Sequence, residues 1–114
     1  MLLAIITIHP QPGDEAKIID VLDSMRGLVA TNAECLGCVL TVEAGAGRAI
    51  FYMERWRTRE ALVKHLASNV YCRVLEAMEL SRIPPEVEFL DVREVGGLEL
   101  VEKARSVQSG SRDN

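Results

Sequence analysis

The first strand that the sequence predicts is apolar on both of its faces. Residues 2–9 (LLAIITIH) are rich in β-branched side chains and are followed by the turn residues of 10–13, a pattern typical of a β-strand. In a strand with one face in water, apolar and polar side chains alternate. Here both sets of alternating positions are apolar: Leu3 and Ile5 on one face, and Leu2, Ala4, Ile6 and Ile8 on the other. The sheet that contains this strand must therefore be covered on both sides.

The remaining pattern predicts the element order β-α-β-β-α-β. After the first strand we expect a helix at 14–30, strands at 38–43 and 48–56, a helix from 58 with a break at 68–69, and a strand at 87–95. Asp14 and Thr58 are the predicted helix caps, and the glycines of 44–47 predict a tight hairpin. One antiparallel sheet with both helices on one face, the ferredoxin-like α+β fold, connects these elements through short loops.

A chain of 114 residues has room for one domain. We assign residues 1–95 to that domain and residues 96–114 to a C-terminal extension. Within the extension, 98–105 is compatible with a short helix or a strand, and the polar residues 106–114 are expected to be frayed.

The second face of the sheet predicts a homodimer. The strands at 48–56 and 87–95 are also apolar on both faces. In the first of them, Phe51 and Met53 lie on one face, and Tyr52 and Trp56 lie on the other. An exposed face of this kind is larger than the apolar patch that a monomer usually tolerates. A second copy of the chain, packed sheet to sheet about a two-fold axis, is its simplest cover.

Charge and cysteine content exclude several classes of function. The net charge of −4 argues against nucleic acid or an anionic membrane surface as a partner, because phosphate binding needs a concentrated cationic face. The apolar run at 2–6 lacks a preceding basic residue and is shorter than the roughly 20 residues of a membrane span. Three cysteines, an odd number, do not indicate a secreted disulfide framework, so the cytoplasm is the expected location.

Residues 54–68 (ERWRTREALVKHLAS) carry a resemblance to a known family. They are similar to the E-x-W-x-S/T-x-E-A-L-x-x-H-L-x-S stretch of the antibiotic biosynthesis monooxygenase superfamily. Pro12-Gly13 before the first helix and Cys35-Leu36-Gly37 before the second strand also match, and the resemblance covers about residues 2–95. It implies a dimeric α/β barrel, the fold on which this family carries out cofactor-free oxygenation, haem degradation and sugar-phosphate isomerisation.

Departures from the family's patterns narrow the implied activity. The haem-degrading branch has an Asn on the first strand, a Trp where this chain has His65, and a ligand His where it has Leu75. The branch that oxidises polyketide phenols has Asn and Tyr where this chain has Tyr52 and Leu62. The retained Trp56 and His65 resemble the quinol-monooxygenase branch, which implies no metal and no cofactor.

Five residues are candidates for a site. His65 lies on or beside the inward face of its helix, where an imidazole could take a phenolic proton or could simply be a satisfied core side chain. Trp56, Tyr52 and Glu54 share one strand face, where they could hold a planar ring or only pack and pair. Tyr71 could reach a ligand oxygen or face the dimer contact.

Two further features predict little chemistry. Cys35 and Cys38 form a CxxC that enters a strand rather than a helix, and residues three apart in a strand point to opposite faces. A zinc site would need two more ligands, which only His9, His65 and Cys72 remain to supply. His9, at a strand end, is expected to be exposed.

The sequence therefore favours a cofactor-independent monooxygenase that acts on quinols or related electron-rich aromatics, with a small aromatic ligand in an apolar pocket. Two alternatives remain on the same fold. One is a dimeric protein that binds a small ligand or serves a stress response without catalysis, and the other is an isomerase.

Overall fold

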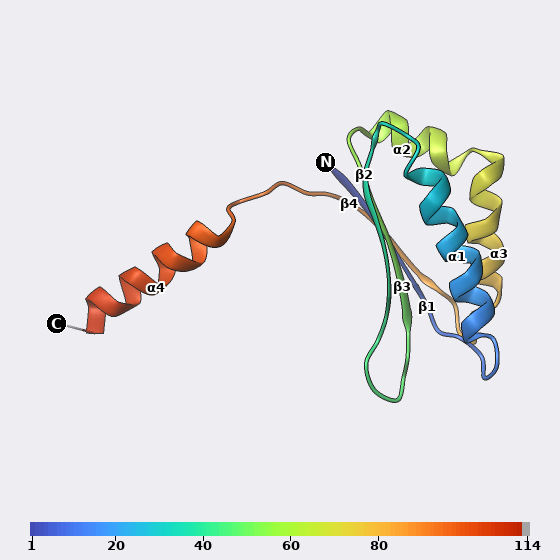
Figure 1. Ribbon diagram of the computed structural model, residues 1–114, viewed down its shortest axis with the longest axis horizontal. Coiled ribbons are helices and arrows are strands. Elements are labelled where there is room, and N and C mark those ends of the chain that lie inside the picture. The colour runs from blue at the N-terminus through green and yellow to red at the C-terminus, as the bar shows by residue number, and fades with distance from the viewer. Residues whose placement is uncertain (113–114) are drawn as a thin grey trace.

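The structure is a computed structural model that describes residues 1–112, with side chains described for residues 1–107. The elements follow in the order β1 (Leu2–Ile8), α1 (Glu15–Val29), β2 (Cys35–Val42), β3 (Ile50–Trp56), α2 (Arg59–Leu66), the 3-10 helix η1 (Asn69–Tyr71), α3 (Cys72–Glu79), β4 (Glu86–Asp91) and α4 (Leu98–Arg112). The four strands form one antiparallel sheet in the order β2-β3-β1-β4. Helices α1, α2 and α3 lie together on one side of it (Figure 1). This arrangement confirms the predicted ferredoxin-like α+β fold.

The core lies between the sheet and these helices. Helix α1 buries the stripe that its sequence spacing predicts, Ile18, Leu22, Met25 and Val29, at steps of three and four residues. The sheet contributes alternate side chains from its two central strands, namely Ala4, Ile6 and Ile8 from β1 and Ile50, Tyr52 and Trp56 from β3. The chain between α2 and α3 changes direction at Ser68, as expected, and η1 brings Tyr71 into the core.

The two predicted caps behave differently. Thr58 has extended backbone angles, and its side-chain oxygen accepts a hydrogen bond from the backbone N–H of Ala61 at 3.2 Å. Asp14 already has helical backbone angles, and its side chain makes no capping hydrogen bond. A cap must lie outside the helical region for its oxygen to reach the free N–H groups.

Several boundaries differ from the expected ones. Strand β2 begins at Cys35 rather than Cys38, because an irregularity between Cys35 and Gly37 lets the strand start earlier. Strand β4 ends at Asp91 rather than Val95. Residues 98–112 form helix α4, so residues 106–112, which we expected to be frayed, are helical, while 113–114 lie outside the described residues.

The face of the sheet opposite the helices is partly apolar and is not covered by the chain's own helices (Figure 1). Met53 on β3 lies between Ile5 on β1 and Val39 on β2, and Leu3 on β1 lies opposite Leu90 on β4. Val39 and Leu90 are exposed. We call this surface the open sheet face.

Helix α4 stands apart from the domain. It extends away from the sheet on the side of the open sheet face (Figure 1), and every described side chain from Leu98 to Val107 is exposed. The radius of gyration is 18.1 Å, against about 13 Å for a compact chain of this length. Within residues 1–112, no helix is long and apolar enough to cross a lipid bilayer.

The difference between the two caps predicts a difference in stability. We expect Thr58→Ala to lower the free energy of unfolding by about 1 kcal/mol, because it leaves a helix N–H without its partner. Asp14→Ala is the matched control and should cost only about 0.3 kcal/mol, through the helix dipole. Urea denaturation measures both, and a larger loss from Asp14→Ala would contradict the assignment.

Candidate active site

Glu54 is a carboxylate buried in the core and held by three donors. Its side chain is 2% exposed. The Tyr52 hydroxyl donates to Oε2 at 2.6 Å and the Trp56 indole Nε1 donates to Oε1 at 3.0 Å. Nε2 of His65 lies 3.1 Å from Oε2. A buried charge is tolerated when hydrogen bonds replace its water, and this one has three.

The local fold explains how these groups meet. Tyr52, Glu54 and Trp56 alternate along β3, so all three point to the helix side of the sheet, where they are buried. Across the sheet from Glu54 lie Ala4 on β1 and Cys38 on β2, two small side chains. His65 comes from the last turn of α2, a helix that Thr58 caps two residues after the end of β3.

The hydrogen bonds determine the charge of Glu54. Burial alone raises the pKa of this carboxyl, but the hydrogen bonds from His65 and Tyr52, the positive charge that a protonated His65 places beside it, and the hydrogen bond from Trp56 together leave the pKa below its ordinary value. Burial and the neighbouring Glu54 charge raise the pKa of Tyr52, which therefore remains a neutral donor. The same two causes raise the pKa of Tyr71 to about 12.

An ionised Glu54 also determines the tautomer of His65. A carboxylate has acceptors only, so the contact with Glu54 requires a proton on Nε2, and in the neutral imidazole Nδ1 then carries the lone pair. Aromatic contacts hold the ring in place: it stacks on Trp56 with centroids 4.7 Å apart and planes inclined by 30°, and Tyr71 meets it edge-on at 5.3 Å.

A pocket of about 420 Å³ opens beside His65 and Trp56. It lies between the C-terminal end of α1, the loop that follows, and helix α2. Its walls are formed by Leu28, Val29, Thr31, Asn32, Glu34, Trp56, Ala61, Lys64, His65, Ser68 and Val70. Of the five predicted residues, His65 and Trp56 are on this wall. Tyr52, Glu54 and Tyr71 lie behind it, so they support the site rather than line the pocket as we expected.

The part of the wall that comes from residues 28–34 could not be predicted from the sequence. No motif marks these residues, and the polar pair Thr31-Asn32 at the end of a helix is an ordinary helix terminus in sequence. The only available indication is positional, since the loop precedes β2, which is the neighbour of β3 in the sheet.

The CxxC geometry differs from our expectation. The irregularity after Cys35 places Cys35 opposite Trp56 and Cys38 opposite Glu54, so both cysteines point to the helix side rather than to opposite faces. Both are free and half-buried, and burial raises the pKa of each thiol, that of Cys38 to about 11. Within residues 1–112, no cluster of three potential metal ligands occurs.

His9 is half-buried rather than exposed. Its backbone N–H donates to the Ser81 hydroxyl at 3.0 Å, and the backbone N–H of Arg82 donates to its carbonyl. Its ring atom Nε2 is buried without a hydrogen-bond partner among the described residues. These contacts are at the opposite end of β1 from the strand residues that pair with Trp56.

Comparison with known proteins identifies the family. The sequence profile of the antibiotic biosynthesis monooxygenase family matches residues 1–77, more than half of the chain. The chain therefore belongs to the antibiotic biosynthesis monooxygenase family. A search of curated proteins gave no match.

Solved structures share the fold. Rv0793 from Mycobacterium tuberculosis is 26% identical, with a TM-score of 0.73 over 83% of this chain and 98% of its own. A protein from Deinococcus radiodurans, proposed to be an antibiotic biosynthesis monooxygenase, is 14% identical, with a TM-score of 0.75 over 85% of this chain and 97% of its own. PA3566 from Pseudomonas aeruginosa is 22% identical, with a TM-score of 0.69 over 82% of this chain and 94% of its own. The family match supports a monooxygenase at the family level.

The buried carboxylate predicts a stability effect. Glu54→Gln replaces an acceptor-only group with one that must present a donor to the same partners, so we expect a loss of about 3 kcal/mol in the free energy of unfolding at neutral pH. Tyr52→Phe, which removes one donor and leaves the carboxylate ionised, should cost about 1.5 kcal/mol.

The pH dependence gives an independent check. Because the pKa of Glu54 is lowered in the folded chain, its contribution is complete above its ordinary value of 4.5 and is lost as the pH falls through the folded pKa. The stability difference between the wild type and Glu54→Gln should therefore narrow as the pH falls below 4.5 and through the lowered pKa of the folded chain. A constant difference would show that the carboxylate is not held ionised.

Proposed function

We propose that this protein is a cofactor-independent monooxygenase that oxidises quinols or related electron-rich phenols in the pocket beside His65. The contact between His65 and Glu54, at 3.1 Å, is the observation that carries the proposal. A buried carboxylate that orients an imidazole at the wall of a pocket is the arrangement that a general base requires. The pocket volume of about 420 Å³ falls in the range of small-molecule sites, and Trp56 offers an aromatic wall for a planar ring.

The proposed reaction begins with a proton transfer. With Nε2 protonated toward Glu54, Nδ1 of His65 accepts the proton of a bound quinol hydroxyl. The Glu54 charge stabilises the imidazolium that forms. This role is analogous to that of an acidic residue that orients a catalytic histidine.

The deprotonated quinol then transfers an electron directly to O₂, with no cofactor between them. The quinolate gives one electron to O₂, and the resulting radical pair combines to form a ring carbon–oxygen bond. The hydroperoxide anion takes the proton back from His65 and loses water, which leaves a carbonyl at the attacked carbon. The sum is quinol plus O₂ to hydroxyquinone plus water, with one oxygen atom in each product.

The activity test follows oxygen and its products together. We expect metal-free protein to consume O₂ with a 1,4-naphthoquinol and to place one ¹⁸O atom from ¹⁸O₂ in a hydroxyquinone, whereas autoxidation gives hydrogen peroxide and the unhydroxylated quinone. His65→Gln should lower kcat by about 10²–10⁴-fold, the usual contribution of a general base. His9→Gln, at the chain's other histidine, is the matched control and should retain activity.

The same experiments distinguish the oxygenase from the two alternative functions, a ligand-binding protein and an isomerase. Tight binding of the quinol without oxygen uptake above the autoxidation rate would favour the ligand-binding protein, and isomerisation of a substrate under nitrogen would favour the isomerase. Oxygen uptake that His65→Gln leaves unchanged would refute only the proton-transfer step.

We also propose that two chains form a homodimer through their open sheet faces. The apolar side chains of this face form a continuous surface over three adjacent strands, β2, β3 and β1. Removing this surface from water favours association in proportion to its apolar area, and a two-fold axis lets one patch cover its copy.

Met53, between Ile5 and Val39, provides the test of the dimer. Light scattering should give twice the chain mass for the wild type at about 10 μM, a concentration at which a micromolar complex is largely formed. Met53→Lys should give the mass of one chain, because it would bury an unpaired ammonium group. Val63→Lys, at an exposed position on α2, should remain dimeric, and a wild-type monomer would refute the dimer.

A further inference from the structure

Helix α4 is amphipathic but has no surface of its own domain to pack against. Leu100, Ala104 and Val107 recur at steps of four and three residues, and Val101 lies beside them, so they form one stripe. The opposite side of the helix carries Glu99, Glu102, Lys103 and Ser106. Leu100, Val101 and Val107 are between 47% and 64% exposed. This apolar stripe is unusual for a helix surrounded by water.

A helix in this situation needs a partner to be stable. An isolated helix of about 15 residues is marginal in water even with an Ala-rich sequence. The 15 residues of α4 include three serines and a glycine, which lower helix propensity further. Packing of the apolar stripe would supply the missing stability.

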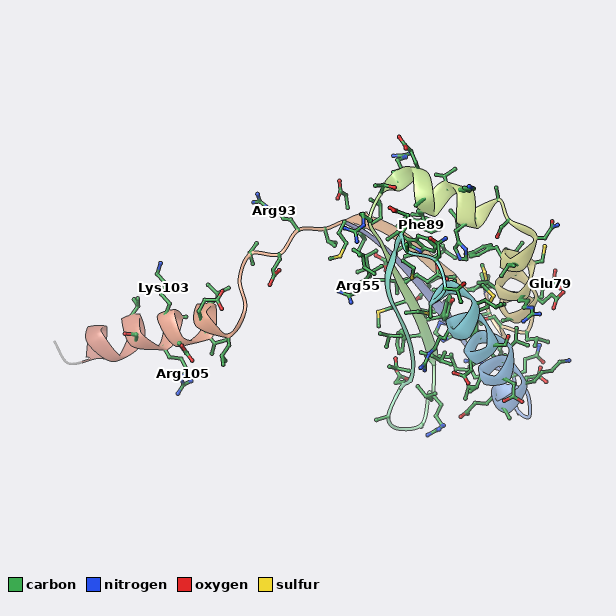
Figure 2. The ribbon with its side chains drawn as sticks, turned by 45° about the horizontal axis from the view of Figure 1, so that its top comes forward. Arg55, Glu79, Phe89, Arg93, Lys103 and Arg105 are labelled. Atoms are coloured by element: carbon green, nitrogen blue, oxygen red, sulfur yellow. The ribbon has the colours of Figure 1, made fainter. Side chains whose placement is uncertain are left out.

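The position of α4 favours a second copy of this chain as the partner. The helix extends from the end of β4 on the side of the open sheet face, away from α1, α2 and α3 (Figure 1). Figure 2 shows Arg93 on the extended link to the domain, and Lys103 and Arg105 pointing to opposite sides of α4, well away from the sheet. A subunit that covers the open sheet face would lie in the space into which α4 extends.

Comparison with the other structures separates α4 from the shared fold. The matched structures align over 80–85% of this chain while 90–100% of their own length is covered. Helix α4 is therefore an addition to the shared fold rather than a part of its core.

We propose that α4 is an exchanged arm, which packs its apolar stripe (Leu100, Val101, Ala104 and Val107) against the other subunit of the dimer. Each subunit extends one arm over its partner, so the contact occurs twice about the two-fold axis. The glycine pair Gly96-Gly97 links the arm to the domain, and the backbone N–H of Gly97 donates to the Glu99 side chain at 2.8 Å, where the helix begins. This inference rests on the proposed dimer but not on the oxygenase activity.

The test compares two double variants of the full chain. Leu100→Ser with Val101→Ser removes the centre of the stripe. Glu102→Ser with Lys103→Ser, on the polar side, loses at least as much helix propensity, because Glu and Lys both exceed Ser whereas Val does not. Sedimentation equilibrium should show that the first pair raises the dimer dissociation constant by at least about tenfold, the effect expected from exposing two buried aliphatic side chains. The second pair should change it by less than about threefold, as surface substitutions usually do.

Hydrogen exchange locates the arm directly. The backbone amides of residues 102–107 should be protected at concentrations where the protein is dimeric, and should lose that protection on dilution below the dissociation constant. If the dimer dissociation constant is the same in both double variants, the exchange of α4 is contradicted, while the dimer itself is not. Protection that persists in the monomer would overturn it in favour of folding back onto the same chain. A wild-type chain that is monomeric throughout would overturn both the dimer and the arm.

Discussion

The ionised Glu54 in the core is the constraint on which the rest of the site depends. A carboxylate withdrawn from water destabilises a small domain unless hydrogen bonds replace its hydration. Here a hydroxyl, an indole and an imidazole from one strand and one helix supply them. Because each donor must keep its direction, the constraint also determines how β3 and α2 pack and which nitrogen of His65 carries the proton. The chemistry proposed for the pocket follows from that second consequence.

The fold and the members of this cluster could be predicted from the sequence because they depend on local periodicity. Alternation along β3 places Tyr52, Glu54 and Trp56 on one face, and helical spacing turns His65 inward. Their roles were less accessible, since alternation along a strand is compatible both with an aromatic wall for a ligand and with core packing, and it favours packing. That Tyr52 and Tyr71 support the site from behind depends on tertiary distances, which spacing does not encode.

The features that prediction missed each depend on an irregularity or on a distant segment. One irregular residue in β2 turns Cys35 to the same side as Cys38. No residue type in the sequence predicts this irregularity. The wall at residues 28–34 meets the pocket only after α1 has packed on the sheet. Residues 98–105 were compatible with strand or helix because their stripe has no partner within the domain, and tertiary packing normally decides such cases.

The hydrogen-bonded group around Glu54 and the pocket wall at residues 28–34 come from different parts of the fold, and this separation has an evolutionary consequence. The groups that orient His65 lie on β3, whereas Leu28, Thr31, Asn32 and Glu34 come from a helix end and a loop, where substitutions and insertions are tolerated best. Variation in this loop can alter the shape of the pocket without disturbing the contact between His65 and Glu54. Under the proposed function, chains that diverge at this loop would change substrate and keep the same reaction, which makes the loop the natural segment to randomise in a directed-evolution library.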